Sequence, residues 1–474
     1  MTLGPEFDEP ALGGLQRLDD AVDRGQARVF RVLWFFLPPG SVARNTQFQQ
    51  LLASRFLTDI ALQALLYSAL IASARAGGRA IDAALLGVAY LLPGVLLGMF
   101  GGIVADALPK RVALGGAYVL MGALAILIPG FFGTDFRSLL GILFAVRILH
   151  QVSQPSEASA VPLVASEDEL ASATSFLSLA SSGGDVIGKA ILAPLIVRVF
   201  GVDPVTVIAG LLFFFSATRV FDLRPQRRRP GAVAPEMEAR MSTLETVRWL
   251  LTERTQLWML LLAALAATMS VILGVLGPQY TRDVLDVDPA NALYVFSPAV
   301  LGLLVALVVA PIAIRVFRER IVAILGFAIV ASAMSALGFV DKLREWLPWF
   351  PVVDLPLVGE RVELAAEISI FVGFGLTLAA TATQTYISRT APLAVQGRTF
   401  ALLGTMKDGL AIIPLLVLGV VADIVGVRAV LTVAPLLLLA TAAGVDGLAG
   451  RLRNGDAEGV EPAVEGAADG PAEG

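Results

Sequence analysis

The chain has 474 residues, of which 56% are hydrophobic and only 16% are charged, whereas soluble domains carry about 25% charged residues. The absence of Cys excludes disulfides and thiol chemistry, and the single histidine, His150, argues against a multi-histidine metal site or a Ser-His hydrolase. The net charge of −5 is small, so we do not expect nucleic acid as a partner. We also expect no cofactor, no metal and no enzymatic activity.

Residues 1–45 are predicted to form a cytoplasmic N-terminal segment. Within it, residues 27–37 mix arginine with large apolar side chains and end before two prolines. This stretch is too short to cross a membrane, so it forms either an interfacial helix or a short helix packed on the protein itself. The first 26 residues are polar and acidic, and no cleavable signal peptide is predicted because a basic region followed by an apolar one is lacking.

Long apolar stretches follow, each close to the roughly 20 residues that cross the hydrocarbon core. Backbone groups inside lipid must be satisfied within the segment, so these stretches are predicted to be helices. We expect an all-α polytopic membrane protein with twelve spans. Their approximate limits are 48–72, 81–105, 111–131, 137–154, 171–197, 202–221, 255–279, 291–315, 320–340, 363–388, 399–422 and 427–449.

A polar break at 222–250, rich in arginine and proline, divides these spans into six and six. A weak repeat supports the division, because VFGVDPVTV at 199–207 resembles IVGVRAVLTV at 424–433. At the same offset of 225 residues, Gly201 falls on Gly426. The predicted units are an N-terminal half at 46–222, a central cytoplasmic loop at 223–250, a C-terminal half at 251–450 and a disordered acidic tail at 451–474.

Lys and Arg in short loops predict the orientation, because cytoplasmic loops carry an excess of both. The loops on the side of the two termini are the richer ones, with Lys110, Arg111 and the run at 224–229 among their basic residues. Both termini are therefore predicted to be cytoplasmic, in a multi-pass protein of a bacterial-type plasma or inner membrane.

Charged side chains inside the spans are candidates for function, because each costs roughly 2.5–3.5 kcal/mol at mid-membrane on insertion scales. In the first span, Arg55 and Asp59 are four residues apart and can pair on one helix face, with Gln63 one turn further along. Arg55 can instead lie at the inner interface. In the fourth span, Arg147 and His150 either line an aqueous cavity or lie near the inner end of the span and reach the headgroups.

The fifth and eleventh spans carry two more charged groups each. Asp185 and Lys189 are four apart in mid-span, so they form either a structural pair that cancels its own charge or a proton-linked or substrate-linked switch. Lys407 and Asp408 are adjacent and therefore lie on different faces of the eleventh span. With Asp59, Gln63 and Arg147, these four residues are our candidates for the substrate and proton-coupling site.

The loop after the second span carries a family signature. Gly102 is followed by Asp106 and by the basic pair Lys110 and Arg111, which resembles the inner-loop motif of the major facilitator superfamily. The resemblance implies the fold of that superfamily, with two six-helix halves. It also implies an inner gate, in which the acid and the basic pair belong to a charge network that latches the helix ends in one state.

Further residues resemble one branch of this superfamily, which includes the enterobactin exporter, macrolide efflux proteins and the bacterial lysophospholipid transporter. The similar segments are 396–398, 419–428 and, in the first span, 56–58 and 64–66. Lys189 stands where exporters of the superfamily carry a proline.

We therefore expect a secondary transporter that works by alternating access, with its site between the two halves. The predicted activity is proton-coupled efflux of an amphipathic small molecule, so the expected partners are that molecule, membrane lipid and the proton gradient. One alternative is a flippase for lysophospholipid. An alternative from another class is a membrane scaffold or receptor without transport activity.

Overall fold

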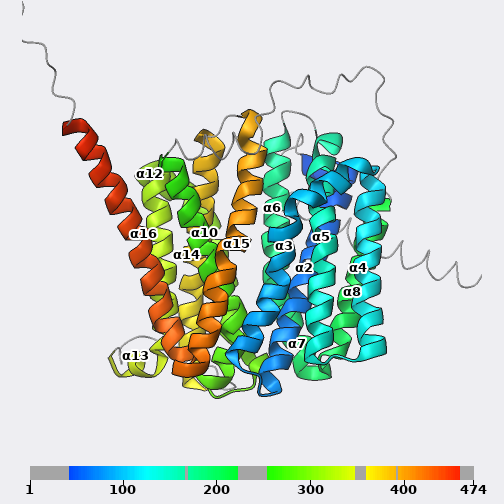
Figure 1. Cartoon of the computed structure of the whole chain (residues 1–474), viewed down its shortest axis with the longest axis horizontal. Helices are drawn as coiled ribbons and strands as arrows, with labels where there is room; N and C mark the ends of the chain where they lie inside the picture. Colours follow the sequence, from blue (N-terminus) through cyan, green and yellow to red (C-terminus); the bar gives the residue numbers. More distant parts are fainter. Residues whose placement is uncertain (1–41, 166–168, 222–253, 347–358, 391–392, 459–474) are drawn as a thin grey trace, which may run out of the picture.

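The computed structural model describes residues 42–165, 169–221, 254–346, 359–390 and 393–458. Every regular element in these residues is helical, and no strand occurs among them (Figure 1). The predicted interfacial helix at 27–37, the central loop and most of the acidic tail lie outside the described residues. The predicted all-α architecture is confirmed.

The first group of helices comprises η1 (Val42–Arg44), α2 (Thr46–Arg75), α3 (Ala80–Ala107), α4 (Lys110–Phe132), α5 (Phe136–Val164), α6 (Leu170–Val186), the π-helical turn η3 (Ile187–Leu192), α7 (Ala193–Phe200) and α8 (Asp203–Phe221). The second group comprises α10 (Arg254–Asp283), the 3-10 turn η4 (Pro289–Asn291), α11 (Ala292–Phe296), α12 (Ala299–Gly338), α13 (Val340–Trp346), α14 (Glu360–Thr390), α15 (Leu393–Val425) and α16 (Val427–Glu458).

Nine helical stretches of the described residues are long and apolar enough to cross a membrane. One of them, Pro289–Gly338, covers two predicted spans. The boundary between these spans is the kink in α12 at Arg318, where φ is 65° and ψ is 156°. The predicted fifth span corresponds to α6, η3 and α7, which follow one another without a gap. The last predicted span begins with the shorter apolar stretch Val427–Ala442. This arrangement is consistent with twelve spans.

The predicted end of the fourth span at residue 154 is wrong, because α5 continues to Val164. The polar residues beyond 154 do not break the helix, because they bond to its own backbone. The hydroxyl of Ser156 donates a hydrogen bond to the carbonyl of Val152 at 2.8 Å. Ser156 and Glu157 are buried against protein, not exposed to lipid. A criterion based on hydropathy therefore ends this helix too early.

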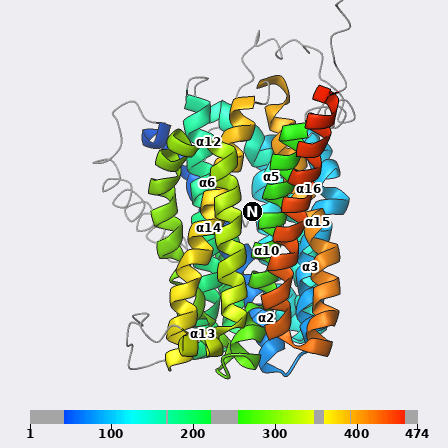
Figure 2. The ribbon, with the colours of Figure 1, turned by 90° about the vertical axis from the view of Figure 1, so that its left-hand side faces the viewer.

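Each group of helices encloses its own buried apolar core. Helices α2–α8 surround one core that includes Phe48, Tyr118 and Phe213, and α10–α16 surround a second that includes Phe327 and Met334. We call the two groups the N-half and the C-half. Figure 1 shows them side by side, and Figure 2 shows from a second direction that their helices run between the same two ends. The limits predicted for the halves stay a prediction.

The internal repeat has a structural counterpart in two turns. Gly201 ends α7 with φ of +89°, and Gly426 follows α15 with φ of +91°, a region that side chains strongly disfavour. The amide of Gly201 donates to the carbonyl of Val197 at 3.2 Å, and that of Gly426 donates to Ala422 at 2.9 Å. Gly426 and Ala422 lie 225 residues after Gly201 and Val197, respectively, so the two halves make the same turn at corresponding positions.

The two ends of the molecule carry different segments. Helix α2 begins and α16 ends at one end, which is uppermost in Figure 1. The short turns at 76–79, 133–135, 201–202 and 284–291 lie at the opposite end. Following the orientation predicted from Lys and Arg, we call the first the inner end and the second the outer end.

Candidate functional site

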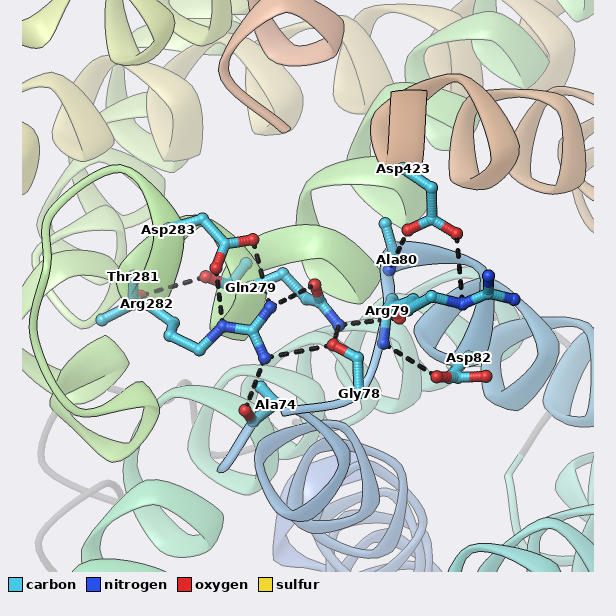
Figure 3. A network of polar contacts seen from close by, with 11 residues as sticks. Ala74, Gly78, Arg79, Ala80, Asp82, Gln279, Thr281, Arg282, Asp283 and Asp423 are labelled. Atoms are coloured by element: carbon cyan, nitrogen blue, oxygen red, sulfur yellow. Dashed lines mark hydrogen bonds and ion pairs between the residues drawn. The ribbon is translucent and has the colours of Figure 1, made fainter. Parts of the chain in front are cut away.

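At the outer end, two side chains of α10 hold the turn that joins α2 to α3 (Figure 3). Arg282 donates to the carbonyls of Ala74 at 2.7 Å and Gly78 at 3.1 Å. Gln279 donates to the carbonyls of Gly78 at 3.1 Å and Arg79 at 2.9 Å. The last carbonyls of a helix lack partners and carry its negative dipole end. A cation of the C-half therefore stabilises the end of the first helix of the N-half.

On the other side of this turn, Asp423 of α15 binds the start of α3 (Figure 3). Its carboxylate accepts a hydrogen bond of 2.7 Å from the amide of Ala80 and lies 3.8 Å from the guanidinium of Arg79. Asp82 accepts from the amide of Arg79 at 2.8 Å within the same half. The first amides of α3 are thus satisfied by one acid from each half.

Two further contacts join the halves at the outer end. Arg75 of α2 pairs with Asp288 at 2.9 Å and also donates to the carbonyl of Val197 at 2.8 Å. Arg198 of α7 donates to the hydroxyl of Tyr294 at 2.8 Å, with its guanidinium 5.2 Å from the ring centroid. Polar groups of α2, α3, α7, α10, α11 and α15 therefore close the outer end, and we call these contacts the outer gate.

Deeper in the molecule, Arg147 of α5 forms an ion pair with Asp408 of α15 at 3.3 Å. The arginine belongs to the N-half and the acid to the C-half. Arg147 also donates to the carbonyl of Tyr90 at 2.9 Å, and its guanidinium lies 4.3 Å from the centroid of that ring. Only 11% of the Arg147 side chain is exposed. Arg147 therefore lies inside the protein between the halves.

The bare backbone of Gly94 on α3 makes room for this ion pair. A Cβ atom on Gly94 would lie 2.5 Å from Asp408 Oδ2 and 3.6 Å from Gln151 Nε2. The first distance is shorter than a normal contact, so any side chain at position 94 would displace the carboxylate of Asp408 from its present place against the helix. Tyr90, Gly94, Arg147 and Gln151, all from the N-half, surround the carboxylate of Asp408. We call these four residues the α3–α5 cradle.

A second branch of the polar centre runs from Tyr90 to Asp185. Gln63 of α2 donates to Asp185 Oδ1 at 3.0 Å and to the hydroxyl of Tyr90 at 3.3 Å. No hydrogen bond or ion pair joins Asp185 to Lys189 among the described contacts. The π-helical turn η3 begins at Ile187, between the two residues, so the helical spacing that would place them on one face is interrupted.

A third group of charges lies within the N-half, between α2, α5 and α6. Arg55 binds Asp59 at 2.6 Å and Glu157 at 3.0 Å, and it donates to the hydroxyl of Ser181 at 3.0 Å. Asp59 and Glu157 are buried, with 4% and 3% exposed. Two buried carboxylates thus share one guanidinium, and the Arg55 side chain packs within the N-half. The sequence prediction missed Glu157, because it ended the fourth span three residues earlier.

Four buried polar atoms in or next to this group have no hydrogen-bond partner among the described residues. They are Thr58 Oγ1, Asp59 Oδ2, His150 Nδ1 and Glu157 Oε1. Buried polar atoms are normally paired, so an unpaired one calls for an explanation. The interior of the N-half therefore combines two buried carboxylates with polar atoms that lack a partner.

The remaining predicted residues are only partly described. Arg111 lies with its guanidinium 5.8 Å from the ring centroid of Phe221, and α4 begins at Lys110. The surroundings of Gly102 and the side chain of Asp106 are not among the described features, so the inner gate stays a prediction. Lys407 forms no ion pair with a described carboxylate. Among the described residues, no group of three or more His, Cys, Asp or Glu side chains is placed to hold a metal ion.

Comparisons with known proteins agree on one fold. A family model described as Major Facilitator Superfamily matches residues 29–414. No curated protein matches the chain in sequence. Among solved structures, a bacterial homologue of the human lysosomal transporter Spinster, inward-facing and occupied, has 14% identity and a TM-score of 0.67, covering 85% of this chain and 96% of that chain.

Two other solved structures are similar at the same level. The nucleoside transporter NupG has 12% identity and a TM-score of 0.62, covering 84% of this chain and 98% of that chain. A bacterial homologue of the iron transporter ferroportin in the inward-facing state has 16% identity and a TM-score of 0.59, with coverages of 84% and 98%. At such low identities these likenesses concern the fold alone.

Proposed function

Since the chain belongs to the Major Facilitator Superfamily, we propose that it is a secondary transporter in which the N-half and the C-half rock against each other. The transported molecule would bind between the halves near mid-membrane, as in other transporters built from repeats. We further propose that the chain exports an amphipathic small molecule and that the proton gradient drives this export.

The observation that carries the proposal is the nature of the contacts between the halves. At the outer end these contacts are charged side chains on helix termini, such as Arg282 on Ala74 and Asp423 on Ala80. At mid-membrane the contact is the ion pair of Arg147 with Asp408. The exposed ion pairs at the outer end can be exchanged for water at modest cost, whereas the buried pair of Arg147 with Asp408 opens only when another partner replaces one of its charges. Both kinds of contact suit an interface that opens in each cycle.

Proton coupling is supported by the buried carboxyl groups of the N-half. Asp59 and Glu157 share the guanidinium of Arg55, and Asp185 is joined to the polar centre through Gln63 and Tyr90. A proton gained or lost by any of these acids changes which partner it prefers. Because the backbone carbonyl of Tyr90 also holds Arg147, we propose that a proton exchanged at Asp185 alters the contact between the halves through Gln63 and Tyr90.

The proposal is tested with the purified chain in proteoliposomes. A panel of labelled amphipathic molecules, with a lysophospholipid among them, is offered with and without an imposed pH gradient. We expect saturable transport of at least one molecule, and this transport should be faster with the pH gradient than without it. A protonophore should reduce the rate to the value measured without a gradient. Transport of lysophospholipid alone would favour the flippase alternative. Absence of transport across the whole panel, with protein that is folded, would favour a scaffold or receptor.

A further inference from the structure

The α3–α5 cradle has the chemistry of an anion site. The guanidinium of Arg147 is fixed from two sides, by the carbonyl of Tyr90 at 2.9 Å and by the face of its ring at 4.3 Å. An arginine held in this way loses little conformational freedom when it binds a carboxylate or phosphate, and its planar donors match either group. The bare backbone of Gly94 leaves space directly beside it.

The present occupant of the cradle is a carboxylate from the other half. Asp408 Oδ2 lies 3.3 Å from Arg147 and would lie 2.5 Å from a Cβ atom on Gly94. The side chain of Asp408 is 29% exposed, whereas that of Arg147 is 11% exposed. The acid therefore enters from the interface between the halves, and the cradle residues form the buried wall that receives it.

We propose that the cradle binds the anionic group of the transported molecule, a carboxylate or a phosphate, and that Asp408 occupies the cradle when this molecule is absent. The inference rests on the proposed transport function and names the class of substrate for that same site. A molecule that takes the cradle displaces Asp408 and removes the ion pair that joins the halves at mid-membrane. Binding of substrate would thus release the contact that restrains rocking.

The charges around Asp408 favour an anion over a cation. An anion that replaces Asp408 keeps Arg147 neutralised, and the displaced Asp408, whose side chain is 29% exposed, can turn toward the interface between the halves. A cation that binds Asp408 leaves the guanidinium of Arg147 buried without a counter-charge, with Lys407 nearby. A buried charge that loses its partner is strongly destabilising. The site therefore selects against amphipathic cations.

The test measures binding of four probes that share a hexyl chain, namely hexanoate, hexyl phosphate, hexyltrimethylammonium and hexyl glucoside. Isothermal titration on the chain in lipid nanodiscs gives the affinities. We expect the two anions to bind more tightly than the neutral and cationic probes. Asp408→Asn, which removes the competing charge, should tighten anion binding about tenfold. Arg147→Gln should abolish it.

Two further variants protect the test against misfolding and surface effects. Gly94→Val fills the cradle without changing any charge, so it should abolish anion binding even if Arg147→Gln does not fold. Asp203→Asn removes an acid at the outer end, where it accepts from Thr134, and should leave all four affinities unchanged. If Asp408→Asn leaves anion binding unchanged, or if hexyltrimethylammonium binds most tightly, the inference is overturned.

The two proposals fail separately. Transport of neutral or cationic molecules that is insensitive to Gly94→Val would overturn the anion site and leave the transporter intact. Anion binding that depends on Gly94 and Arg147, in a chain that transports nothing, would uphold the cradle and overturn the transport function. Binding of only one of hexanoate and hexyl phosphate identifies which of the two groups the substrate carries.

Discussion

Asp423 of α15 accepts a hydrogen bond of 2.7 Å from the backbone amide of Ala80, the residue at which α3 begins. An acid of the C-half therefore caps a helix of the N-half. The first amides of a helix have no partner within it, and the positive end of the helix dipole favours an anion there. The contact joins the two halves across the outer gate, so separation of the halves at this end would break it.

The Asn variant of Asp423 should shift the chain toward opening at its outer end. Asn keeps an acceptor oxygen but loses the negative charge at the positive end of the helix dipole, which contributes about 0.3–1 kcal/mol and corresponds to an increase of up to about fivefold in the open population. The chain contains no native Cys, so Val275→Cys provides a single reporter. Val275 is buried and packs against Gly87 of the other half. A membrane-impermeant maleimide added from outside should label it faster in the Asp423→Asn background.

Asp82 provides the matched control, because its carboxylate caps the same helix from within the N-half. Asp82→Asn should weaken the start of α3 without changing the labelling of Val275→Cys. Equal acceleration by both variants would mean that the cap acts on α3 alone and not on the outer gate.

Removal of Arg55 should destabilise the chain strongly. Asp59 and Glu157 would then lie buried without their common partner, and breaking a buried pair in this way costs roughly 3–5 kcal/mol. Thermal unfolding in detergent should show a large decrease in Tm for Arg55→Gln. The triple variant with Asp59→Asn and Glu157→Gln should recover most of it, because the unpaired charges are gone.

Arg75→Gln is the comparison for this prediction. Arg75 and Asp288 are 30% and 50% exposed, and exposed ion pairs contribute about 1 kcal/mol or less. A loss of stability for Arg75→Gln as large as that for Arg55→Gln would contradict the assignment of a buried charge cluster.

The close approach of the π-helical turn to α2 predicts opposite effects of one substitution at two glycines. A Cβ atom on Gly188 would lie 2.5 Å from the carbonyl oxygen of Ile60, whereas a Cβ atom on Gly404 meets nothing within 4 Å. Gly188→Ala should therefore lower the free energy of unfolding by about 1–3 kcal/mol. Gly404→Ala should raise it by up to about 1 kcal/mol, because Ala favours a helix over Gly. Equal effects on Tm would contradict the packing described for Gly188.

Proton coupling predicts that Asp59→Asn and Asp185→Asn uncouple transport from the proton gradient. Neither variant can exchange a proton at the altered position, so the imposed pH gradient should no longer accelerate export. Exchange of substrate across the membrane without a gradient should continue at a measurable rate. Gradient-driven transport that is unchanged in both variants would contradict the coupling hypothesis.

Much of the fold was predictable because the lipid environment restricts the secondary structure of a chain that crosses it. Long apolar stretches must be helical in lipid, and this gave the all-α architecture and the approximate spans. The criterion failed where polar side chains face protein, as at Glu157, which a hydropathy profile assigns to a loop although α5 continues to Val164. The kink at Arg318 inside α12 falls in the predicted break between the spans 291–315 and 320–340, where charged residues interrupt the apolar stretch.

The candidate site was predictable as a set of residues but not as a set of contacts. Expensive charges in the spans pointed to Arg147 and Asp408, yet the two are 261 positions apart and only tertiary packing pairs them. Spacing suggested a pair of Asp185 with Lys189, but the π-helical turn between them breaks the helical periodicity. The outer gate was missed, because the groups that Arg282 binds there are backbone carbonyls, which every residue possesses.

Alternating access is tested most directly by distances at both ends of the molecule. Spin labels at Phe132→Cys and Lys342→Cys report the separation of the halves at the outer end, and labels at Val112→Cys and Val316→Cys report it at the inner end. All four positions are exposed, and the chain offers no other Cys for the label. The distances are compared between the unaltered background and the double variant Arg282→Gln with Asp423→Asn. We predict that the outer distance becomes longer and the inner distance shorter in the double variant. Distances that stay unchanged, or that change in the same direction at both ends, would contradict the account.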